Sequence, residues 1–374
     1  YTIDWVDESR TSYMLDGQET PITTRLETYA VNRGNSVTDT VKYTVWGPIA
    51  NGGDYDGMAM RWLPNLAIPS SDPAAFQKLN VSQTVDDFLA ALDEYRAPAQ
   101  NFVYANVDND IAMRIGGRLP LRPEGQGRFV SDGSNSANGW SGYIPSSHNP
   151  VSVNPGRNFV SSANQRTTAE DYPYYYTGGK YFEDYRGITL NRYLAAAENA
   201  SAEDMRKLQQ SNFSLKAEKA LPLLISAIDS VDLSPDEQQV VDALKLWDYN
   251  YSADLQEPLL FDKWFGYMFR TTWDEIDSLD KSVNALYPES WWTIELAAQY
   301  PDTSVFDLVS TEKDESFSDI ARMALEMTVE KMESLEDGLT WGEYRKTTVG
   351  PVSYTHLRAH ETYLLISYAV FCLK

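Results

Sequence analysis

The opening part of the chain alternates polar and apolar residues with the period of two that is typical of strands. Two runs rich in β-branched and aromatic residues, 20–31 and 38–46, lie on either side of the turn-like sequence Asn32–Ser36. This arrangement predicts a hairpin, because turn residues between two such runs reverse the chain. The short run 58–62 predicts a further strand.

A helix and a second hairpin are predicted next. The apolar positions of 85–95 fall on one face of a helix. Residues 102–105 and 111–115 flank the turn sequence Asp108–Asp110 and predict a hairpin. Residues 116–180 are rich in Gly, Pro, Asn, Ser and Tyr, and predict long loops over a scaffold.

From about residue 186 the apolar residues recur with the helical period. Ser201, followed by Glu203 and Asp204, is typical of a helix N-terminus. Pro222 predicts a kink or the start of a new helix. Further helices are predicted over 235–247, 257–271 and 316–335. A β-rich first half followed by a mostly helical second half indicates the α+β class.

These patterns divide the chain into three parts. Residues 1–190 form a β-rich part with long loops, and residues 191–349 form a mainly helical part. Residues 350–374 resemble translated adaptor sequence, so a non-native tail is predicted there. His356 and His360 in this tail are four residues apart, but no further metal ligands lie nearby, and no metal site is expected.

The composition narrows the kinds of partner and chemistry. The chain of 374 residues has 31 Lys and Arg against 54 Asp and Glu, a formal charge of −23. Such an acidic surface repels phosphates, which argues against nucleic acid or an anionic membrane as the main partner. With 1 Cys and 3 His, intramolecular disulfides and zinc sites made of Cys₄ or Cys₂His₂ are excluded. His148 lies in a loop-like sequence and is expected to be a solvated side chain.

Several short motifs occur in order along the chain up to about Val349. They are Thr44–Ile49, Ala59–Trp62, Pro98–Asn106, Gly117–Arg122, Gly139–Pro145, Asn154-Pro155, Ser162–Arg166, Tyr185-Arg186 and Leu339–Tyr344. None is specific alone, but together they resemble the penicillin acylase family of N-terminal nucleophile hydrolases. The chain departs from that family at Trp46, where His is usual, at Asn106, where Asp is common, and at Gln165, where a second Asn is usual.

The resemblance implies a mechanism that needs no histidine. In this family a proenzyme cuts itself to expose an N-terminal Ser, whose own α-amino group acts as the base for acyl-enzyme formation on an amide. Asn164 matches the family's oxyanion donor, and Arg186 matches the arginine that positions the nucleophile region. Arg192 is the competing candidate, but its place in a helical run indicates an ordinary surface pair.

The resemblance also implies the fold, the cofactors and the place of the chain within its precursor. The fold expected is a partial four-layer αββα sandwich with a mainly helical C-terminal extension. No cofactor is expected for the chemistry, while a structural calcium ion is expected to find its main ligands outside this chain. The opening residues Tyr1–Trp5 carry no initiator Met or signal peptide, so we interpret the chain as an internal piece of the β-chain that lacks the nucleophile and is inactive alone.

The expected partners are an acyl amide, such as a β-lactam side chain or an acyl-homoserine lactone, and the α-chain of the same precursor. Family members are mostly periplasmic or secreted, which predicts export of the whole protein. The alternative is a secreted or periplasmic binding module without catalysis, whose aromatic loops between 172 and 182 grip a ligand.

Three further sequences suggest sites. The turns at Asp54–Gly57 and Asp108–Asp110 look like fragments of calcium loops, but neither has the remaining ligands, and both are expected to be ordinary turns. Tyr172–Tyr176 fits either an apolar ligand site or the packing of a loop on the core. Trp291-Trp292, at a predicted helix start, is expected to belong to the core.

Overall fold

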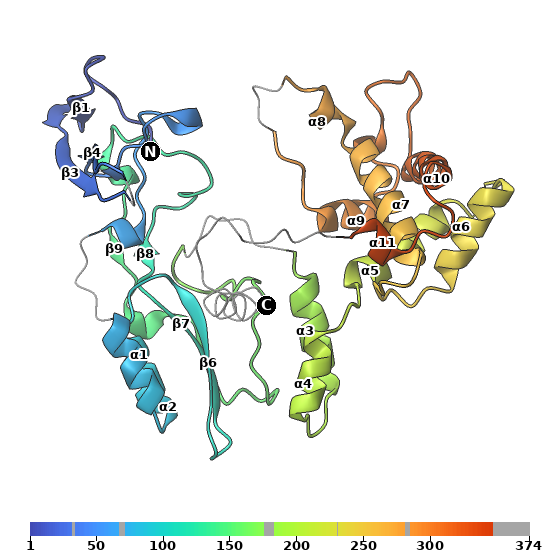
Figure 1. The fold of residues 1–374 in the computed structure, drawn as a ribbon, viewed down its shortest axis with the longest axis horizontal. Helices are drawn as coiled ribbons and strands as arrows, with labels where there is room; N and C mark the ends of the chain where they lie inside the picture. The colour runs from blue at the N-terminus through green and yellow to red at the C-terminus, as the bar shows by residue number, and fades with distance from the viewer. Residues whose placement is uncertain (32–33, 67–71, 176–182, 230, 281–284, 347–374) are drawn as a thin grey trace. The chain divides into compact units, whose positions relative to one another are not determined.

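The chain folds into two compact units, Tyr1–Phe182 (unit 1) and Glu183–Lys374 (unit 2). The computed structural model describes residues 1–31, 34–66, 72–175, 183–229, 231–280 and 285–346. Figure 1 shows the strands gathered in unit 1 and helices alone labelled in unit 2. The predicted tail 350–374, including His356 and His360, lies outside the described residues.

Unit 1 begins with two antiparallel hairpins. β1 (Ser12–Leu15) pairs with β2 (Gln18–Pro21), and β3 (Thr23–Tyr29) pairs with β4 (Val37–Thr44). β4 also pairs with the short strand β5 (Gly47–Pro48). The β3–β4 register sets Tyr29 opposite Val37. The hairpin predicted over 20–46 is therefore confirmed.

The strand predicted over 58–62 does not form. Only Ala59 pairs, as an isolated bridge to Ile49. The backbone of this segment instead passes close to Gly47, which has φ of 123°, and a Cβ added there would lie 2.3 Å from the Met60 carbonyl oxygen. Two backbone hydrogen bonds flank the isolated bridge, from the Ala50 amide to the Met58 carbonyl oxygen at 2.8 Å and from the Met60 amide to the Pro48 carbonyl oxygen at 2.9 Å, so the pairing is too short to count as a strand.

A second sheet has the order β10–β7–β6, formed by β10 (Val151–Val153), β7 (Ile111–Gly116) and β6 (Gln100–Ala105). The β6–β7 pair confirms the second predicted hairpin. Two helices, α1 (Asp72–Val81) and α2 (Val85–Leu92), lie beside this hairpin (Figure 1).

One face of this sheet packs against the two helices. Phe88 and Leu92 of α2 form a cluster with Ala112 of β7. Arg114 on the same face is buried, and its guanidinium donates to the Leu89 carbonyl oxygen at 2.7 Å. The helix predicted over 85–95 is confirmed, and its start carries a reciprocal cap between Thr84 and Asp87.

The remaining short elements of unit 1 lie in the long loops. They are the strands β8 (Pro120–Leu121) and β9 (Gly142–Tyr143), and the 3₁₀ turns η1 (Gly53–Tyr55), η2 (Leu63–Asn65), η3 (Ser136–Asn138) and η4 (Ser146–His148). The loop-rich character predicted for 116–180 is thus seen in its described residues.

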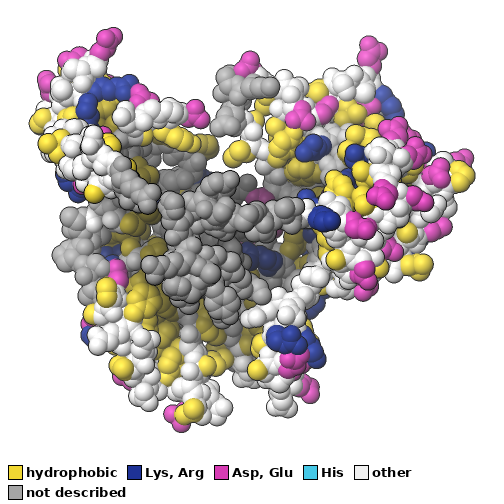
Figure 2. All heavy atoms as spheres, in the orientation of Figure 1, with side chains coloured by type: hydrophobic (Ala, Val, Ile, Leu, Met, Phe, Trp, Pro, Cys, Tyr) yellow, Lys and Arg dark blue, Asp and Glu magenta, His cyan; other side chains and the backbone are white. Residues whose placement is uncertain are grey.

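The regular elements of unit 2 among its described residues are helices, apart from an isolated bridge between Phe213 and Asn250. Its elements are α3 (Tyr185–Ala196), α4 (Ala202–Gln209), α5 (Leu215–Ala227), α6 (Pro235–Lys245), α7 (Glu257–Thr272), α8 (Asp274–Ser278), α9 (Ser290–Gln299), η6 (Ser304–Phe306), α10 (Phe317–Glu333) and α11 (Trp341–Tyr344). The helices predicted over 235–247, 257–271 and 316–335 are confirmed. Figure 2 shows acidic side chains recurring over the surface of these helices, in keeping with the net charge of −23.

The core of unit 2 centres on the packing of α7 against α10. Trp264 of α7 is 0% exposed, and its indole nitrogen donates to the Ala321 carbonyl oxygen at 2.9 Å. Pro222 lies inside α5 and does not start a new helix. Leu221 and Leu224 beside it are buried, so packing holds the helix together across the proline.

The core position predicted for Trp291 and Trp292 is wrong. These side chains are 41% and 47% exposed. The buried residues of α9 are Thr293, Ile294 and Ala297. Their spacing of one, three and four residues defines one helical face, and the two tryptophans lie off that face.

The N-terminus of α10 predicts an acid-sensitive contribution to stability. The Asp319 carboxylate accepts from the Ser316 amide at 3.0 Å and pairs with Lys313 at 2.5 Å. These contacts, the Lys313 hydrogen bond first, lower the pKa of Asp319 from 3.8 to about 2. Because the folded-state pKa is depressed, this stabilisation is present above about pH 4 and is lost as pH falls toward 2.

We therefore expect Asp319→Asn to lower the free energy of unfolding by about 0.3–1 kcal/mol at pH 7. The difference from the unsubstituted chain should shrink as pH falls from about 4 toward 2. Urea unfolding at several pH values measures it. Asp302→Asn, at an exposed carboxylate of the same unit, serves as the control. A deficit for Asp319→Asn that is constant across this pH range would contradict the assignment.

Among the described residues, no helix combines the length and apolarity that crossing a membrane requires.

Candidate functional site

The segment that carries Asn164 crosses the second face of the β10–β7–β6 sheet. Side chains alternate along a strand, so Asn101 of β6 points away from the face on which Phe102 packs with α2. The Asn101 side-chain amide donates to the Ser162 hydroxyl at 2.6 Å. This hydrogen bond, made two residues before Asn164, holds the Asn164 segment against β6.

Asn164 itself is exposed and adopts a left-handed backbone conformation with φ of 63°. Asparagine enters this region more readily than most residues. Next to it, the Ala163 amide donates to the Gln165 side-chain oxygen at 2.6 Å, which closes a tight local turn. The turn therefore presents the Asn164 side chain at the surface of unit 1.

The far end of the same segment is held by aromatic packing. Tyr172 and Tyr174 pack against a cluster of Ile115, Leu119 and Ile144 on this second face. The Tyr172 hydroxyl donates to the His148 carbonyl oxygen at 3.0 Å. For these two tyrosines the structure shows the packing role, while Tyr176 of the same run lies outside the described residues.

His148 is exposed, as expected, and its Nδ1 lies 2.6 Å from the Tyr174 hydroxyl. Between the two anchored ends of the segment, a cavity of about 350 Å³ lies against the sheet. Met113, Ile115, Thr167 and Tyr172 are among the residues that line it.

Arg186 lies in the first turn of α3, in unit 2, and is exposed. It lines a cavity of about 670 Å³ together with Lys216 and Tyr251. Burial lowers the pKa of Lys216, against the opposing effect of Glu183 and Asp262. Burial also raises the pKa of Tyr251. Glu183 also lines this cavity, which thus joins cationic, carboxylate and phenolic groups.

Arg192, the competing candidate, makes an ordinary surface pair. Its guanidinium donates to the two carboxylate oxygens of Glu218 at 2.9 and 2.8 Å. Both side chains are partly exposed. This prediction is confirmed.

Asn164 and Arg186 belong to different compact units. The structure places each of them within its own unit. Their convergence on one cleft stays a prediction.

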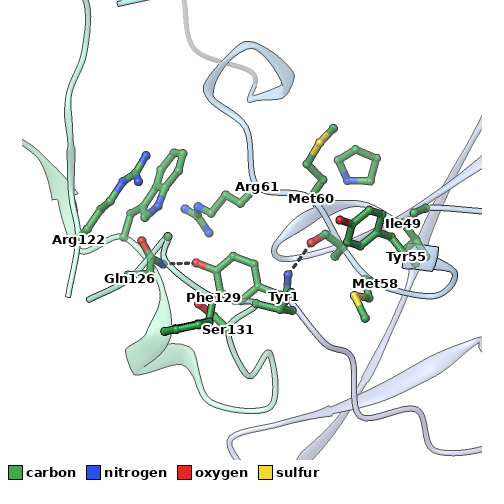
Figure 3. Close-up of a pocket in the computed structure, with 16 residues that line it drawn as sticks. Tyr1, Ile49, Tyr55, Met58, Met60, Arg61, Arg122, Gln126, Phe129 and Ser131 are labelled. Atoms are coloured by element: carbon green, nitrogen blue, oxygen red, sulfur yellow. Dashed lines mark hydrogen bonds between the residues drawn. The ribbon is translucent and has the colours of Figure 1, made fainter. Parts of the chain in front are cut away.

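A further cavity of about 520 Å³ lies in unit 1 and was not predicted from the sequence. Figure 3 shows its two ends. Arg61, Arg122 and Gln126 lie at one end, and Met58, Tyr55 and Ile49 lie at the other. The cavity is therefore cationic at one end and apolar at the other.

The cationic end is built as a stack of rings and guanidinium groups. The Arg122 and Arg61 guanidinium carbons lie 5.6 and 5.0 Å from the centre of the Trp140 ring. Arg61 also lies 5.8 Å from the ring centre of Trp46, on which Tyr1 stacks with 4.2 Å between ring centres. Cations over indole faces are attracted by the ring quadrupole.

Trp46, one of the departures from the family pattern, is buried in this stack. Its indole nitrogen donates to the Gly133 carbonyl oxygen at 2.8 Å. A Cβ added at Gly139 would lie 2.8 Å from the ring, so the ring needs a glycine there. The motifs that contain Arg61, Arg122 and Trp140 were visible in the sequence, but only the fold brings them together.

The Tyr1 hydroxyl lies at the cationic end of the cavity, and the charges there affect its pKa. It donates to the Asn138 carbonyl oxygen at 3.1 Å, and the Gln126 amide donates to it. Burial raises the pKa of this hydroxyl, while the nearby Arg61 and Arg122 act in the opposite direction.

No cluster of three or more His, Cys, Asp or Glu side chains suited to a metal occurs among the described residues. The two calcium-like turns have local partners. Asp56 pairs with Arg10 at 2.7 Å. The Asn106 side chain accepts from the Asp108 and Asp110 amides at 3.0 and 2.9 Å. Both turns are thus held by local hydrogen bonds or ion pairs.

Asn106, another departure from the family pattern, also donates to the Asp110 carboxylate at 3.1 Å. An aspartate at this position would lose the donor and face a like charge. The local network therefore favours the amide.

Comparison with known proteins gives a consistent result. Residues 1–364 match the family model described as penicillin amidase. The chain is 27% identical over 251 residues to an acyl-homoserine lactone acylase QuiP of Pseudomonas syringae pv. syringae (strain B728a), covering 66% of this chain and 29% of that protein. Over 177 residues it is 24% identical to the penicillin acylase 2 proenzyme of Pseudomonas sp. (strain SE83), covering 47% and 23%.

Among solved structures, the thermostable penicillin G acylase from Alcaligenes faecalis matches with a TM-score of 0.70 and 17% identity, covering 92% of this chain and 66% of that chain. This similarity confirms the α+β class and the N-terminal nucleophile hydrolase fold. The family match continues to residue 364, beyond Val349, where the resemblance was expected to stop. The chain spans only 29% of the length of the QuiP relative named above.

Proposed function

The chain belongs to the penicillin amidase family, and on that basis we propose that the protein is an amidohydrolase that cleaves a linear amide bond. The observation that carries this proposal is the family match over residues 1–364, supported by relatives named as acylases. The proposed nucleophile is an N-terminal Ser outside these 374 residues. Its hydroxyl attacks the amide carbonyl, its own α-amino group takes the proton, and water then releases the acid.

Asn164 is proposed to donate a hydrogen bond to the oxyanion of the tetrahedral intermediate. Its position in a turn that is tied to β6 supports this role, because a donor held in place needs no reorganisation during the reaction. Arg186 is proposed to stand near the α-amino group. A cation there lowers the pKa of the amine by like-charge repulsion and keeps more of it in the basic form.

An acyl-homoserine lactone is the proposed substrate, with the amide of a β-lactam side chain as the second choice. The first choice is supported by relatives named acyl-homoserine lactone acylases, and the second by one named a penicillin acylase. We also propose that an α-chain of the same precursor completes the site, that the whole protein is processed and either exported to the periplasm or secreted, and that it holds a structural calcium ion. The 374 residues alone are proposed to be inactive.

The function is tested by expressing the complete gene and incubating its product with an N-acyl-homoserine lactone and with penicillin G. Release of homoserine lactone or 6-aminopenicillanic acid, followed by mass spectrometry, supports the amidohydrolase. Ligand binding without either product supports the alternative, a binding module. Mass spectrometry of the mature protein tests the mechanism separately, because no newly exposed N-terminal Ser, Thr or Cys would contradict it.

Arg186→Ala is expected to shift the acidic limb of the pH profile of kcat/KM to higher pH. Without the nearby cation the pKa of the amine rises, and a higher pH is needed to free the base. Arg186→Lys should restore much of the original profile. Arg192→Ala, in the same helix but paired with Glu218, is the matched control and should leave the profile in place. If the acidic limb of Arg186→Ala were unshifted, the result would contradict the role proposed for Arg186.

Asn101 is expected to act as a positioning residue for the Asn164 segment, through its hydrogen bond to Ser162. Asn101→Ala should lower kcat by about 10-fold or more with little change in KM, since misplacement by roughly 1 Å can cost about 10² in rate. Ser162→Ala should give a similar loss, while Ser162→Thr keeps the hydroxyl and should retain activity. All variants are assayed in the complete protein.

A double variant separates positioning from a general structural role. In an Asn164→Ala background, adding Asn101→Ala should cost almost nothing more in kcat, because the group that Asn101 positions is already gone. Full additivity of the two losses would show instead that Asn101 acts through the fold as a whole.

A further inference from the structure

We propose that the 520 Å³ cavity of unit 1 binds a carboxylate that carries an apolar chain, with the carboxylate at Arg61 and Arg122 and the chain against the apolar end. The proposal rests on the shape and chemistry of this cavity and not on the proposed function.

The first step of the argument is the charge at the cationic end. The chain has 54 acidic against 31 basic residues, so a cation readily finds an acidic neighbour. Within the described part of the chain, however, Arg61 and Arg122 contact aromatic rings and not carboxylates. Their Nε atoms are buried without a hydrogen-bond acceptor. With no carboxylate beside them among the described residues, the two guanidinium charges that line this cavity favour an anion as the group they bind.

The second step is the geometry of the two guanidinium groups. Each packs over the Trp140 ring, which limits its motion. Guanidinium groups held in this way bind a carboxylate with less loss of entropy than mobile ones. Gln126 lies at the same end, as Figure 3 shows, where its side-chain nitrogen donates to the Tyr1 hydroxyl and to the Asn138 carbonyl oxygen.

The third step concerns the opposite end. Ile49 and Met58 line it, and Figure 3 shows these side chains on the far side of the cavity from Arg122. An apolar chain laid against them gains from leaving water, and methionine side chains adapt to chains of differing shape. A small inorganic anion would leave this end unused, and a neutral hydrocarbon would leave the arginines without a counter-charge. The volume of about 520 Å³ suits a ligand that uses both ends.

Binding of decanoate to the full 374-residue chain, measured by isothermal titration calorimetry, tests this proposal. We expect decanoate to bind at one site, at least about tenfold more tightly than 1-decanol or acetate. 1-Decanol lacks the carboxylate and its charge-assisted hydrogen bonds, and acetate lacks the apolar chain. Equal binding of decanoate and 1-decanol, or no binding of decanoate, would overturn the proposal. This comparison uses the unsubstituted chain and needs no variant to fold.

Variants then locate the site. The double variant Arg61→Met and Arg122→Met should weaken decanoate binding at least about tenfold. Arg118→Met removes an arginine that packs over Tyr143 at 5.2 Å, outside the cavity, and should leave binding unchanged. Undiminished binding to a folded double variant would place the ligand elsewhere and overturn the assignment. Amide hydrolysis is measured separately in the complete protein, so either result leaves the test of the proposed function intact.

Discussion

Replacing Asn164 by alanine in the complete protein is expected to lower kcat for amide hydrolysis by about 10²–10³-fold, the loss typical of one oxyanion donor. The hydrogen bond that Asn164 donates strengthens as charge develops on the oxygen, so its loss falls on the transition state and not on substrate binding. KM should therefore change little. Steady-state kinetics with an acyl-homoserine lactone measures both constants.

The matched control is Asn158→Ala. Asn158 is also exposed and has φ of 59°, close to the 63° of Asn164, so both substitutions place alanine in a left-handed conformation. The backbone cost of the two changes is thus alike. Asn158→Ala should keep kcat within about twofold, against the loss expected for an oxyanion donor. Equal kcat values for the two variants would contradict the role proposed for Asn164.

The sequence predicts the regular elements well where local chemistry decides them. The β6–β7 hairpin follows from alternating residues around Asp108–Asp110, and the start of α4 follows from Ser201, which caps the amide of Asp204. The α+β class follows from the change of period near residue 186. Asn164 and Arg186 were reached only through the family resemblance, because nothing in their local sequence marks an oxyanion donor or a positioning arginine.

Several features that the sequence did not predict depend on contacts between residues far apart in the chain. Residues 58–62 look like a strand, but they form only one bridge, from Ala59 to Ile49. The stack of Tyr1 on Trp46 and of Arg61 on Trp140 joins separate motifs, and no local pattern encodes it. The hydrogen bond from Asn101 to Ser162 spans 61 residues in the same way.

The stability of unit 2 should depend strongly on Trp264. Trp264→Ala is expected to lower the free energy of unfolding by about 3–5 kcal/mol, which corresponds to a fall in melting temperature of roughly 6–20 °C for a unit of this size. The side chain is 0% exposed between α7 and α10, so its removal leaves a cavity that packed helices fill only in part. Thermal unfolding of the full chain, followed by circular dichroism at 222 nm, measures the change.

Trp292→Ala provides the matched control, because it removes the same side chain from the same unit at a site that is 47% exposed. It should change the free energy of unfolding by no more than about 0.5 kcal/mol. Trp264→Phe separates two contributions, since it keeps much of the ring volume but loses the hydrogen bond to Ala321. Its cost should lie between those of the two alanine variants. Equal effects of Trp264→Ala and Trp292→Ala would mean that the α7–α10 contact does not form the core of unit 2, since burial is the main difference between these two sites.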